Sequence, residues 1–431
     1  MPRPSASGLP ATEPPGPQAA FAAALTAAEG RARLGALGLA VSGGGDSMAL
    51  MLLARDWAGA RGVSLKVATV DHGLRPEAAE EARMVAGAAR ELGLSHDILT
   101  WDEAPGRGNL QDAARQARYR LLADWAGAQG LDAVALGHTL DDQAETFLAR
   151  LARGSGVDGL AAMRDDWHRQ GMRWLRPLLT VRRGDLRDFL TGRGVGWVED
   201  PSNDDPRFQR VRARRALAAL APLGLDAPTL AATAARLTQA RVVLARAAFE
   251  AAGAVCRVEA GDVRLAAAAF DLPEETRFRL FAHALGWVAS ARYRPRLNAL
   301  AAALAAVRRG EARALHGCLI RPEPEGQGGG VRICREYQAV RSLTAAPGRL
   351  WDNRWRLRGP DRGCHIRALG AAIADCPDWR ATGRPRMALM ADPAVFREGV
   401  LIAAPLAGLA RGWQAEFSPI GGDFAASLLS H

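Results

Sequence analysis

Lysine is almost absent from this sequence, and its absence excludes one common kind of nucleotide-binding loop. Lys66 is the only lysine among the 56 basic residues, so arginine carries almost all of the positive charge. A Walker A loop needs a lysine directly after its glycines, and no lysine stands in such a position. A phosphate-binding loop of that class is therefore excluded.

Paired cysteines are also absent. The five cysteines lie far apart in the sequence, and no two of them form a C-x-x-C pair. Neither a zinc ribbon nor a disulfide framework is indicated, and we expect a cytoplasmic protein in a reducing environment. The cysteines are Cys256, Cys318, Cys334, Cys364 and Cys376.

Long apolar runs and the features of a signal peptide are missing as well. Residues 1–20 are rich in Pro, Ala and Gly and lack a basic segment followed by an unbroken apolar core, which predicts a flexible tail. Near the other end, residues 400–410 include a proline and are far fewer than the ~20 that a membrane-spanning helix needs. We therefore expect no membrane partner.

The chain is long and basic. Its 431 residues have room for two or three domains of ~100 to 200 residues each. The 56 basic residues outnumber the 46 acidic ones and give a net charge of +10, which favours a polyanionic partner such as nucleic acid or acidic lipid. A coding bias toward arginine is the alternative explanation.

Short apolar runs alternate with alanine-rich segments from Ala36 to about Leu190. This pattern predicts an α/β fold with a doubly wound parallel sheet, whose ligands gather at the carboxyl ends of the strands. Segments such as residues 47–60 and 77–92 have the length of helices that cover both faces of a sheet. The expected strands are residues 37–41, 65–71, 96–101 and 133–137.

The α/β pattern defines the first of three expected domains, over residues 21–215. An almost strandless, alanine-rich segment predicts a helical domain over residues 216–309. From residue 310 to residue 431, short strand-like runs alternate with Gly and Pro turns, which predicts a small α+β domain. Its expected strands are residues 330–335, 350–357 and 399–403.

A glycine-rich turn between an apolar strand and an apolar helix is the strongest chemical signal. There, backbone N–H groups and the positive end of the helix dipole can surround a phosphate. Phosphate would repel Asp46 unless a divalent cation lay between them, which indicates Mg²⁺. The alternative is a tight connection without a ligand. The turn reads Ser42-Gly43-Gly44-Gly45-Asp46-Ser47.

A second polar group follows the expected strand at residues 133–137. His138 comes directly after it, and Asp142 and Glu145 lie three residues apart on the next helix, so all three can face one cleft. Asp141 and Glu145 are one turn apart, and like charges at that spacing weaken a helix unless a cation joins them. Mg²⁺ and a substrate ammonium are the candidates. The alternative is that these acids complement the helix dipole.

Further candidate ligands lie on one strand end and two helices. Asp71 and His72 end the second expected strand, where they can meet a nucleotide or simply form a turn. Arg115 and Arg118 share a helix. Three arginines at helical spacing can track phosphates, or they belong to a solvated surface or an interdomain salt bridge. These three are Arg207, Arg210 and Arg214.

The glycine-rich turn resembles the PP-loop of the ATP pyrophosphatase family, whose members cleave ATP between the α- and β-phosphates and adenylate a carbonyl oxygen. Further motifs over residues 36–215 resemble, in the same order, the tRNA(Ile)-lysidine synthetases. Val211 departs from that pattern, because the family usually has Asn there. The motifs are Val70 to Arg75, Asn109-Leu110-Gln111, Ala114-Arg115, Arg118-Tyr119, Gly137 to Thr146, Arg153 to Gly156, Arg176-Pro177-Leu178, Trp197 and Asp200 to Asn203.

This resemblance implies an ATP-dependent ligase that forms a carbon–nitrogen bond. Its substrates would be free L-lysine and an isoleucine tRNA with a CAU anticodon, and its cofactors ATP and Mg²⁺. The modified tRNA would change its codon specificity from methionine to isoleucine. A homodimer is left open.

The resemblance also assigns roles to residues. Those implied as catalytic are Asp46, His138, Asp142, Glu145 and Arg118. Those implied in ATP binding are Ser42, Gly43, Gly44, Gly45, Asp46, Ser47, Asp71 and His72. Those implied in tRNA binding are Arg115, Arg118, Arg207, Arg210 and Arg214, together with residues 310–431, and the metal would be held by Asp46 and Asp142.

Two other functions stay open at this point. A tRNA 2-thiolase would activate the same kind of carbonyl, but it generally needs cysteines near the loop, and no cysteine precedes Cys256. An ATP-binding regulatory protein would use the same fold without chemistry. The sequence also leaves open which of His138, Asp142 and Glu145 handles the lysine amine.

Overall fold

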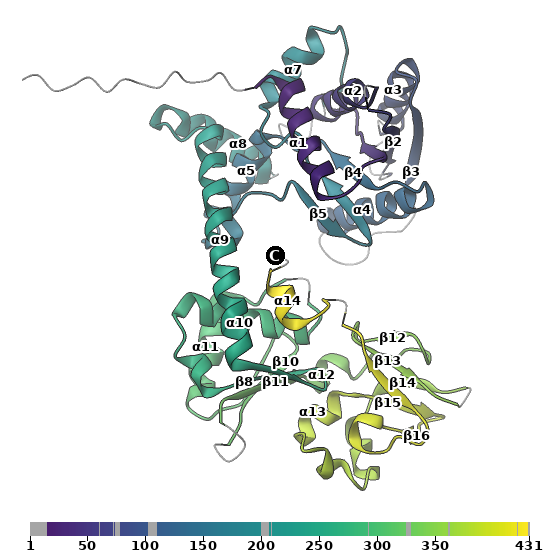
Figure 1. Cartoon of the computed structure of the whole chain (residues 1–431), viewed down its shortest axis with the longest axis vertical. Helices are drawn as coiled ribbons and strands as arrows, with labels where there is room; N and C mark the ends of the chain where they lie inside the picture. Colours follow the sequence, from purple (N-terminus) through teal and green to yellow (C-terminus); the bar gives the residue numbers. More distant parts are fainter. Residues whose placement is uncertain are drawn as a thin grey trace, which may run out of the picture. The chain divides into compact units, whose positions relative to one another are not determined.

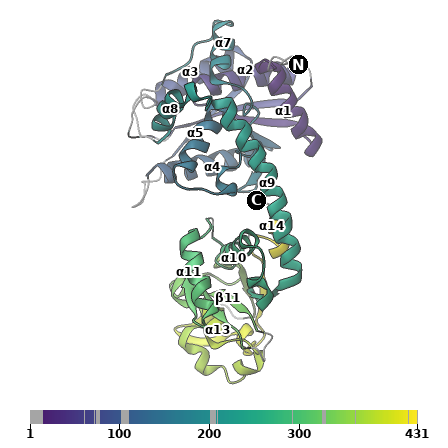
Figure 2. The same ribbon diagram turned by 90° about the vertical axis from the view of Figure 1, so that its left-hand side faces the viewer.

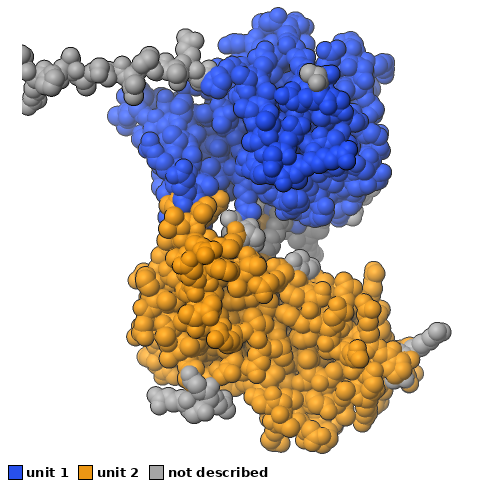
Figure 3. Space-filling model, viewed as in Figure 1, with its two compact units in different colours: residues 1–239 blue, residues 240–431 orange. Residues whose placement is uncertain are grey.

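The computed structural model of the chain divides into two compact units, residues 1–239 and 240–431 (Figure 3). The boundaries that we expected at residues 215 and 309 do not coincide with this division. The described residues are 15–59, 61–71, 73, 78–101, 110–199, 207, 209–291, 293–324, 329–360, 363–419 and 421–429.

The first unit contains a six-stranded sheet in the order β3-β2-β1-β4-β6-β5 (Figure 1). All neighbouring strands pair in parallel except β5, which pairs antiparallel with β6. The predicted parallel α/β fold is confirmed, and the first four strands begin or end within a residue of the expected ranges. The strands are β1 (Ala36–Ala40), β2 (Ser64–Asp71), β3 (Ser95–Thr100), β4 (Ala133–Leu136), β5 (Asp166–Arg169) and β6 (Met172–Leu175).

Helices cover both faces of this sheet because alternate residues of each strand point to opposite sides. In β4, Ala133 and Ala135 belong to the hydrophobic cluster that includes α1, α2 and α7. Val134 and Leu136 belong to the cluster of α4. The helices are α1 (Pro17–Arg31), α2 (Gly45–Gly59), α3 (Ala78–Glu91), α4 (Leu110–Ala128), α5 (Leu140–Leu151), α6 (Val157–Leu160), α7 (Arg183–Thr191) and α8 (Gln209–Leu220).

The start of α1 corrects one expectation. We expected a flexible tail over residues 1–20, but α1 begins at Pro17 and buries Ala20 and Phe21. Proline suits the first helical position because the N–H that it lacks has no partner there. Residues 1–14 lie outside the described part of the chain.

Helix α9 (Ala227–Val255) begins in the first unit and ends in the second. Before it, α8 packs beside α5 and so reaches the carboxyl edge of the sheet (Figures 1 and 2). Within the described residues, none of the helices taken singly has the length and apolar character needed to cross a membrane. One pair of helices bent by 98°, Gln209–Leu223 with Ala227–Val255, reaches the length and apolar composition of a membrane span only when the two are taken together.

The second unit begins with a five-stranded sheet in the order β7-β8-β11-β10-β9. Its first hairpin, β7 (Cys256–Glu259) and β8 (Asp262–Leu265), lies inside residues 216–309, which we expected to be helical. The hairpin turns at Ala260 and Gly261, both with positive φ. The remaining elements are β9 (Arg313–Leu315), β10 (Cys318–Pro322), β11 (Val331–Arg335), α10 (Glu274–Val288) and α11 (Leu297–Arg308), whose helices pack on the sheet.

Two three-stranded sheets and short helices complete the second unit, which matches the predicted α+β character of the C-terminal segment. The sheet orders are β12-β13-β17 and β14-β15-β16. The elements are α12 (Tyr337–Val340), β12 (Leu350–Trp351), β13 (Trp355–Arg358), β14 (His365–Ala368), α13 (Arg386–Ala391), β15 (Pro393–Arg397), β16 (Val400–Ala403), β17 (Gln414–Phe417) and α14 (Phe424–Leu429).

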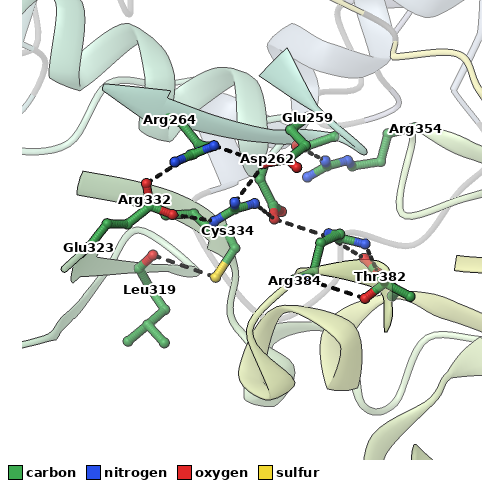
Figure 4. A network of polar contacts seen from close by, with 12 residues as sticks. Glu259, Asp262, Arg264, Leu319, Glu323, Arg332, Cys334, Arg354, Thr382 and Arg384 are labelled. Atoms are coloured by element: carbon green, nitrogen blue, oxygen red, sulfur yellow. Dashed lines mark hydrogen bonds and ion pairs between the residues drawn. The ribbon is translucent and has the colours of Figure 1, made fainter. Parts of the chain in front are cut away.

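A buried network of arginines and carboxylates joins these sheets (Figure 4). Arg332 of β11 contacts Asp262 of β8 at 3.0 Å and Glu323 at 2.9 Å. Arg384, which precedes α13, contacts the same Asp262 at 3.0 Å and also pairs with Asp392. Asp262 therefore receives two guanidinium groups, which links the five-stranded sheet to the segment that carries α13.

Candidate active site

The glycine-rich turn connects β1 to α2 and is closed by a serine hydroxyl. Ser47 Oγ accepts a hydrogen bond from the N–H of Ser42 at 3.1 Å and donates to the carbonyl of Gly44 at 2.9 Å. Gly43 has φ of +90°, a conformation that residues with a Cβ rarely adopt. The turn thus holds the start of α2 at the carboxyl edge of the sheet, where a phosphate would meet its N–H groups.

The start of α5 lies directly against this turn because Gly137 has no side chain. A Cβ on Gly137 would lie 3.1 Å from the carbonyl oxygen of Asp46 and 3.2 Å from the Cα of Ser47. Since β1 and β4 are neighbours in the sheet, the helices that follow them start side by side. Ligands of doubly wound proteins bind at such a point.

The segment before residue 200 covers the other side of the turn. Val198 donates its N–H to the carbonyl of Gly43 at 2.9 Å. The ring of Trp197 lies 3.4 Å from the position of a Cβ on Gly45. A larger residue at position 45 would therefore press on this ring.

Asp142 is held by the capping box of α5. Its Oδ2 accepts hydrogen bonds from the N–H of Thr139 at 2.8 Å and from the Thr139 hydroxyl at 3.0 Å. Asp142 therefore caps the start of α5, in line with the alternative that acids here complement the helix dipole. Burial alone would raise the pKa of Asp142, but the charge of Arg183 and the hydrogen bond from the Thr139 N–H lower it. Its Oδ1 is left to face other groups.

Arg183, the first residue of α7, lies among three carboxylates. Its Nε is 3.1 Å from Asp46 Oδ2, its Nη1 is 3.0 Å from Glu145 Oε1, and its Nη2 is 3.5 Å from Asp142 Oδ1. The cation that the spacing of the acids requires is therefore met in this structure by a guanidinium. Sequence reasoning missed Arg183, because nothing local separates it from the many other arginines.

Two arginines of the basic helix also reach these acids. Arg214 Nε is 3.1 Å from Glu145 Oε1, and Arg210 Nη1 is 3.9 Å from Asp142 Oδ1. Their side chains remain 42% and 57% exposed, so both can also face solvent. Arg207 lies before the start of α8 and is exposed.

Glu145 is the most buried carboxylate of the group, with 2% of its side chain exposed. Its Oε1 receives both Arg183 and Arg214. Its Oε2 is buried and has no hydrogen-bond partner among the described residues. This oxygen is an acceptor that still lacks a donor among the described residues.

His138 lies on the cationic side of the site. Arg176 donates from Nε to His138 Nδ1 at 3.3 Å. Burial, followed by the charge of Arg176, lowers the pKa of His138 to about 3. The imidazole is therefore neutral at neutral pH, and hydrogen bonding by Arg176 makes Nδ1 the acceptor nitrogen.

Arg118 joins Arg176 and Arg210 around this histidine. Burial lowers the pKa of Arg118, and the neighbouring charges of Arg115 and Arg210 lower it further. Arg115 lies over the ring of Tyr119 at 5.4 Å. A group of arginines that repel one another is a suitable place for phosphate groups.

Asp71 takes part in a turn, which was the alternative to contact with a nucleotide. Its Oδ1 accepts the N–H of Gly73 at 2.8 Å, at the carboxyl end of β2. Strand β2 pairs with β1, so Asp71 lies one strand away from the glycine-rich turn. His72 lies outside the described residues.

The carboxylates fit an Mg²⁺ ion that arrives with a nucleotide. Burial raises the pKa of Asp46 to about 6, and the charge of Arg183 opposes this rise. Within the described part of the chain, no cluster of three or more His, Cys, Asp or Glu residues could hold a metal by itself. Mg²⁺ commonly uses only one or two carboxylates together with substrate phosphates, and Asp46 and Oδ1 of Asp142 can supply these.

Comparison with known proteins shows the family of this chain. Residues 18–221 match the model of the PP-loop domain family. The tRNA(Ile)-lysidine synthase of Ruegeria pomeroyi is 53% identical, and the match covers 92% of this chain and 94% of that protein. The lysidine synthase of Methylobacterium nodulans is 45% identical over 64% of this chain and 81% of its own length.

A more distant relative also matches most of the chain. The tRNA(Ile)-lysidine synthase of Wolbachia pipientis is 35% identical, over 76% of this chain and 78% of its own length. The Ruegeria match includes nearly all of both units, so the similarity is not confined to the nucleotide-binding fold. The chain therefore belongs to the tRNA(Ile)-lysidine synthase family of ATP-using PP-loop ligases, the family that its motifs resemble.

Proposed function

We propose that this chain joins free L-lysine to carbon 2 of the wobble cytidine of an isoleucine tRNA with a CAU anticodon, with ATP as the energy source. One observation carries this proposal. The phosphate-binding turn with Asp46 and the acids Asp142 and Glu145 meet around a single guanidinium at the carboxyl edge of the sheet. A nucleotide and an amine can therefore be bound in one place.

The first step makes the oxygen on carbon 2 able to leave. The oxygen attacks the α-phosphorus of ATP, the bond between the α- and β-phosphates breaks, and pyrophosphate departs. The turn from Ser42 to Ser47 and the start of α2 stabilise the negative charge on the phosphates. Mg²⁺ supplies further charge neutralisation when bound, and Asp46 and Asp142 are the residues that would hold it.

The second step forms the new carbon–nitrogen bond. The lysine amine attacks carbon 2, and AMP leaves with the original oxygen. The amine must be deprotonated to react, and the carboxylates of Asp142 and Glu145 are the groups that can orient the ammonium or accept its proton. His138 can only donate from Nε2, because its Nδ1 already accepts from Arg176. The unpartnered Oε2 of Glu145 supports an amine-binding role for this residue.

The tRNA would approach over the arginines beside this site. Arg115, Arg118, Arg207, Arg210 and Arg214 are the proposed contacts to its backbone, and the C-terminal segment, residues 310–431, is proposed to bind the rest of the molecule. Because Arg210 and Arg214 also contact Asp142 and Glu145, tRNA phosphates would compete with or share these arginines.

The test is a reaction with purified protein, ATP, labelled lysine and the isoleucine tRNA. We expect label in the tRNA, with one AMP and one pyrophosphate released for each lysine transferred. A sulfur-containing product would indicate a thiolase, and ATP binding without pyrophosphate release would indicate a regulatory protein. The cysteines favour neither sulfur transfer nor metal binding, since all five are buried in the second unit and burial raises the pKa of Cys256 and Cys318 to about 12.

A cytoplasmic location, the absence of a membrane partner and a homodimer stay predictions. Sedimentation of the purified chain with and without tRNA would measure the oligomeric state, and fractionation of cells would measure the location.

A further inference from the structure

Two hydrogen bonds connect the start of α7 and the residues just before it to the first turn of α5. The N–H of Arg183 donates to Asp141 Oδ2 at 2.7 Å. In return, the N–H of Leu140 donates to the carbonyl of Val181 at 3.0 Å. The backbone of Arg183 is therefore fixed relative to the helix that carries Asp142 and Glu145.

The side chain of Arg183 is correspondingly confined. It is 18% exposed and contacts carboxylates from two different helices, Asp46 on α2 and the acids of α5. A planar guanidinium has several donors in a fixed arrangement, which suits contacts to several carboxylates at once. A lysine at this position would reach fewer of them.

The contact with Glu145 fixes which oxygen is left for a ligand. Arg183 and Arg214 both approach Oε1, at 3.0 and 3.1 Å, while Oε2 is buried without a partner among the described residues. A buried acceptor without a donor is unfavourable, because it has lost its hydrogen bond to water. A ligand that donates a hydrogen bond to Oε2 would remove this cost.

The charge balance depends on whether tRNA is bound. Three carboxylates, Asp46, Asp142 and Glu145, contact the three guanidinium groups of Arg183, Arg210 and Arg214. Asp141 accepts only the main-chain N–H of Arg183. Under the proposed function, tRNA phosphates would draw on Arg210 and Arg214, and the acids would then have negative charge left for an ammonium.

We propose that Arg183 is a positioning residue for the amino-acid substrate: it holds Oε1 of Glu145 so that Oε2 is presented to the lysine ammonium. This inference rests on the proposed function. Under this inference Arg183 does not touch the reacting atoms itself. Its substitution should therefore weaken lysine binding more than it slows ATP cleavage.

The test compares Arg183→Met and Arg183→Lys with the matched control Arg182→Met, whose exposed residue lies just before α7. Three quantities are measured: KM and kcat for lysine in the transfer reaction, tRNA-dependent pyrophosphate release, and direct binding of lysine by calorimetry. Circular dichroism checks the fold of each variant.

We expect Arg183→Met to raise KM for lysine and to weaken lysine binding, both by roughly 10- to 100-fold, as for loss of a hydrogen bond to a charged group. Pyrophosphate release should fall less than lysine affinity does, because Mg²⁺ would replace Arg183 as the cation beside Asp46 once the nucleotide is bound. Arg183→Lys should lie between Arg183→Met and wild type, and Arg182→Met should match wild type.

Lysine affinity within about twofold of wild type in a folded Arg183→Met protein overturns the inference, as does an equal loss in both steps. If Arg183→Met does not fold, Arg183→Lys decides: unchanged lysine affinity in that variant also overturns it. A wild-type protein that transfers no lysine contradicts the proposed function itself, which is a different result from a wild-type protein that transfers lysine independently of Arg183.

Discussion

Arg176 donates a hydrogen bond to Nδ1 of His138 and brings a fixed positive charge to within 3.3 Å of that ring. Protonation of His138 would place a second positive charge beside the first and remove the acceptor. This relationship, together with burial, explains why the pKa of His138 is lowered to about 3.

We therefore predict that His138 remains neutral throughout the range in which an ordinary histidine titrates, near pH 6.5. The sign follows from linkage: because the folded-state pKa is the lower one, the stability that neutral His138 contributes is present above pH 6.5 and is lost as the pH falls toward 3. NMR titration of the histidine rings, with His138→Gln to assign the signal, measures this directly. An inflection of the His138 signal near pH 6.5 contradicts the prediction.

For Asp46→Asn we predict loss of pyrophosphate release in an otherwise folded protein. The amide can still accept a hydrogen bond from Arg183 but carries no charge to hold a metal beside phosphate. Pyrophosphate is measured with saturating tRNA, ATP and lysine, and Asp185→Asn, an exposed acid on α7, serves as control. A wild-type rate of pyrophosphate release in folded Asp46→Asn would show that Asp46 has no role in ATP cleavage.

For Arg210→Ala and Arg214→Ala we predict weaker tRNA binding and a flatter dependence on salt. Each lost phosphate contact should reduce the slope of log affinity against log salt by about one unit. Arg212→Ala is the matched control, because a residue two positions away cannot share their face of α8. Unchanged tRNA affinity across the salt series would mean that these arginines serve only as ion-pair partners of Asp142 and Glu145.

For Glu145→Gln we predict that lysine transfer falls much more than tRNA binding does. The amide keeps the shape of the side chain and removes the charge that an ammonium needs. Pyrophosphate should still form, and adenylated tRNA should accumulate, which mass spectrometry of the tRNA detects. Loss of pyrophosphate release as well would mean that the acids chiefly serve the first step.

For Arg384→Met we predict a loss of about 3–5 kcal/mol in the free energy of unfolding. The substitution leaves Asp392 without its guanidinium partner and Asp262 with Arg332 alone, in a region where these carboxylates are buried. Urea unfolding measures the change, and exposed Arg386→Met is the control. A difference between the two variants below about 1 kcal/mol would show that the network adds little to stability.

The sheet of the first unit was predictable because its signals are local. The apolar run before Ser42 and the glycines after it define a strand and a phosphate-binding turn without reference to any distant residue. Helix spacing placed Asp142 and Glu145 toward one cleft, the strand rule placed that cleft at the carboxyl edge of the sheet, and the family resemblance added Asp46 as a partner of Asp142.

Arg183 could not be found in this way. Its role comes from the packing of α7 beside α2 and α5, and its sequence neighbourhood is ordinary. The hairpin of β7 and β8 was missed for a related reason: two short strands after the long α9 carry too few alternating residues to stand out from an alanine-rich background.

Gly137 determines how far apart the two halves of the proposed reaction lie. The closest approach there is between main-chain atoms, since the carbonyl of Asp46 and the Cα of Ser47 fill the space that a Cβ would take. The spacing between the nucleotide turn and the acids of α5 is therefore a property of the peptide backbone. Changes of side chains in the two hydrophobic clusters would leave this spacing unchanged. A single methyl group added at position 137, in contrast, would push the two backbone segments apart.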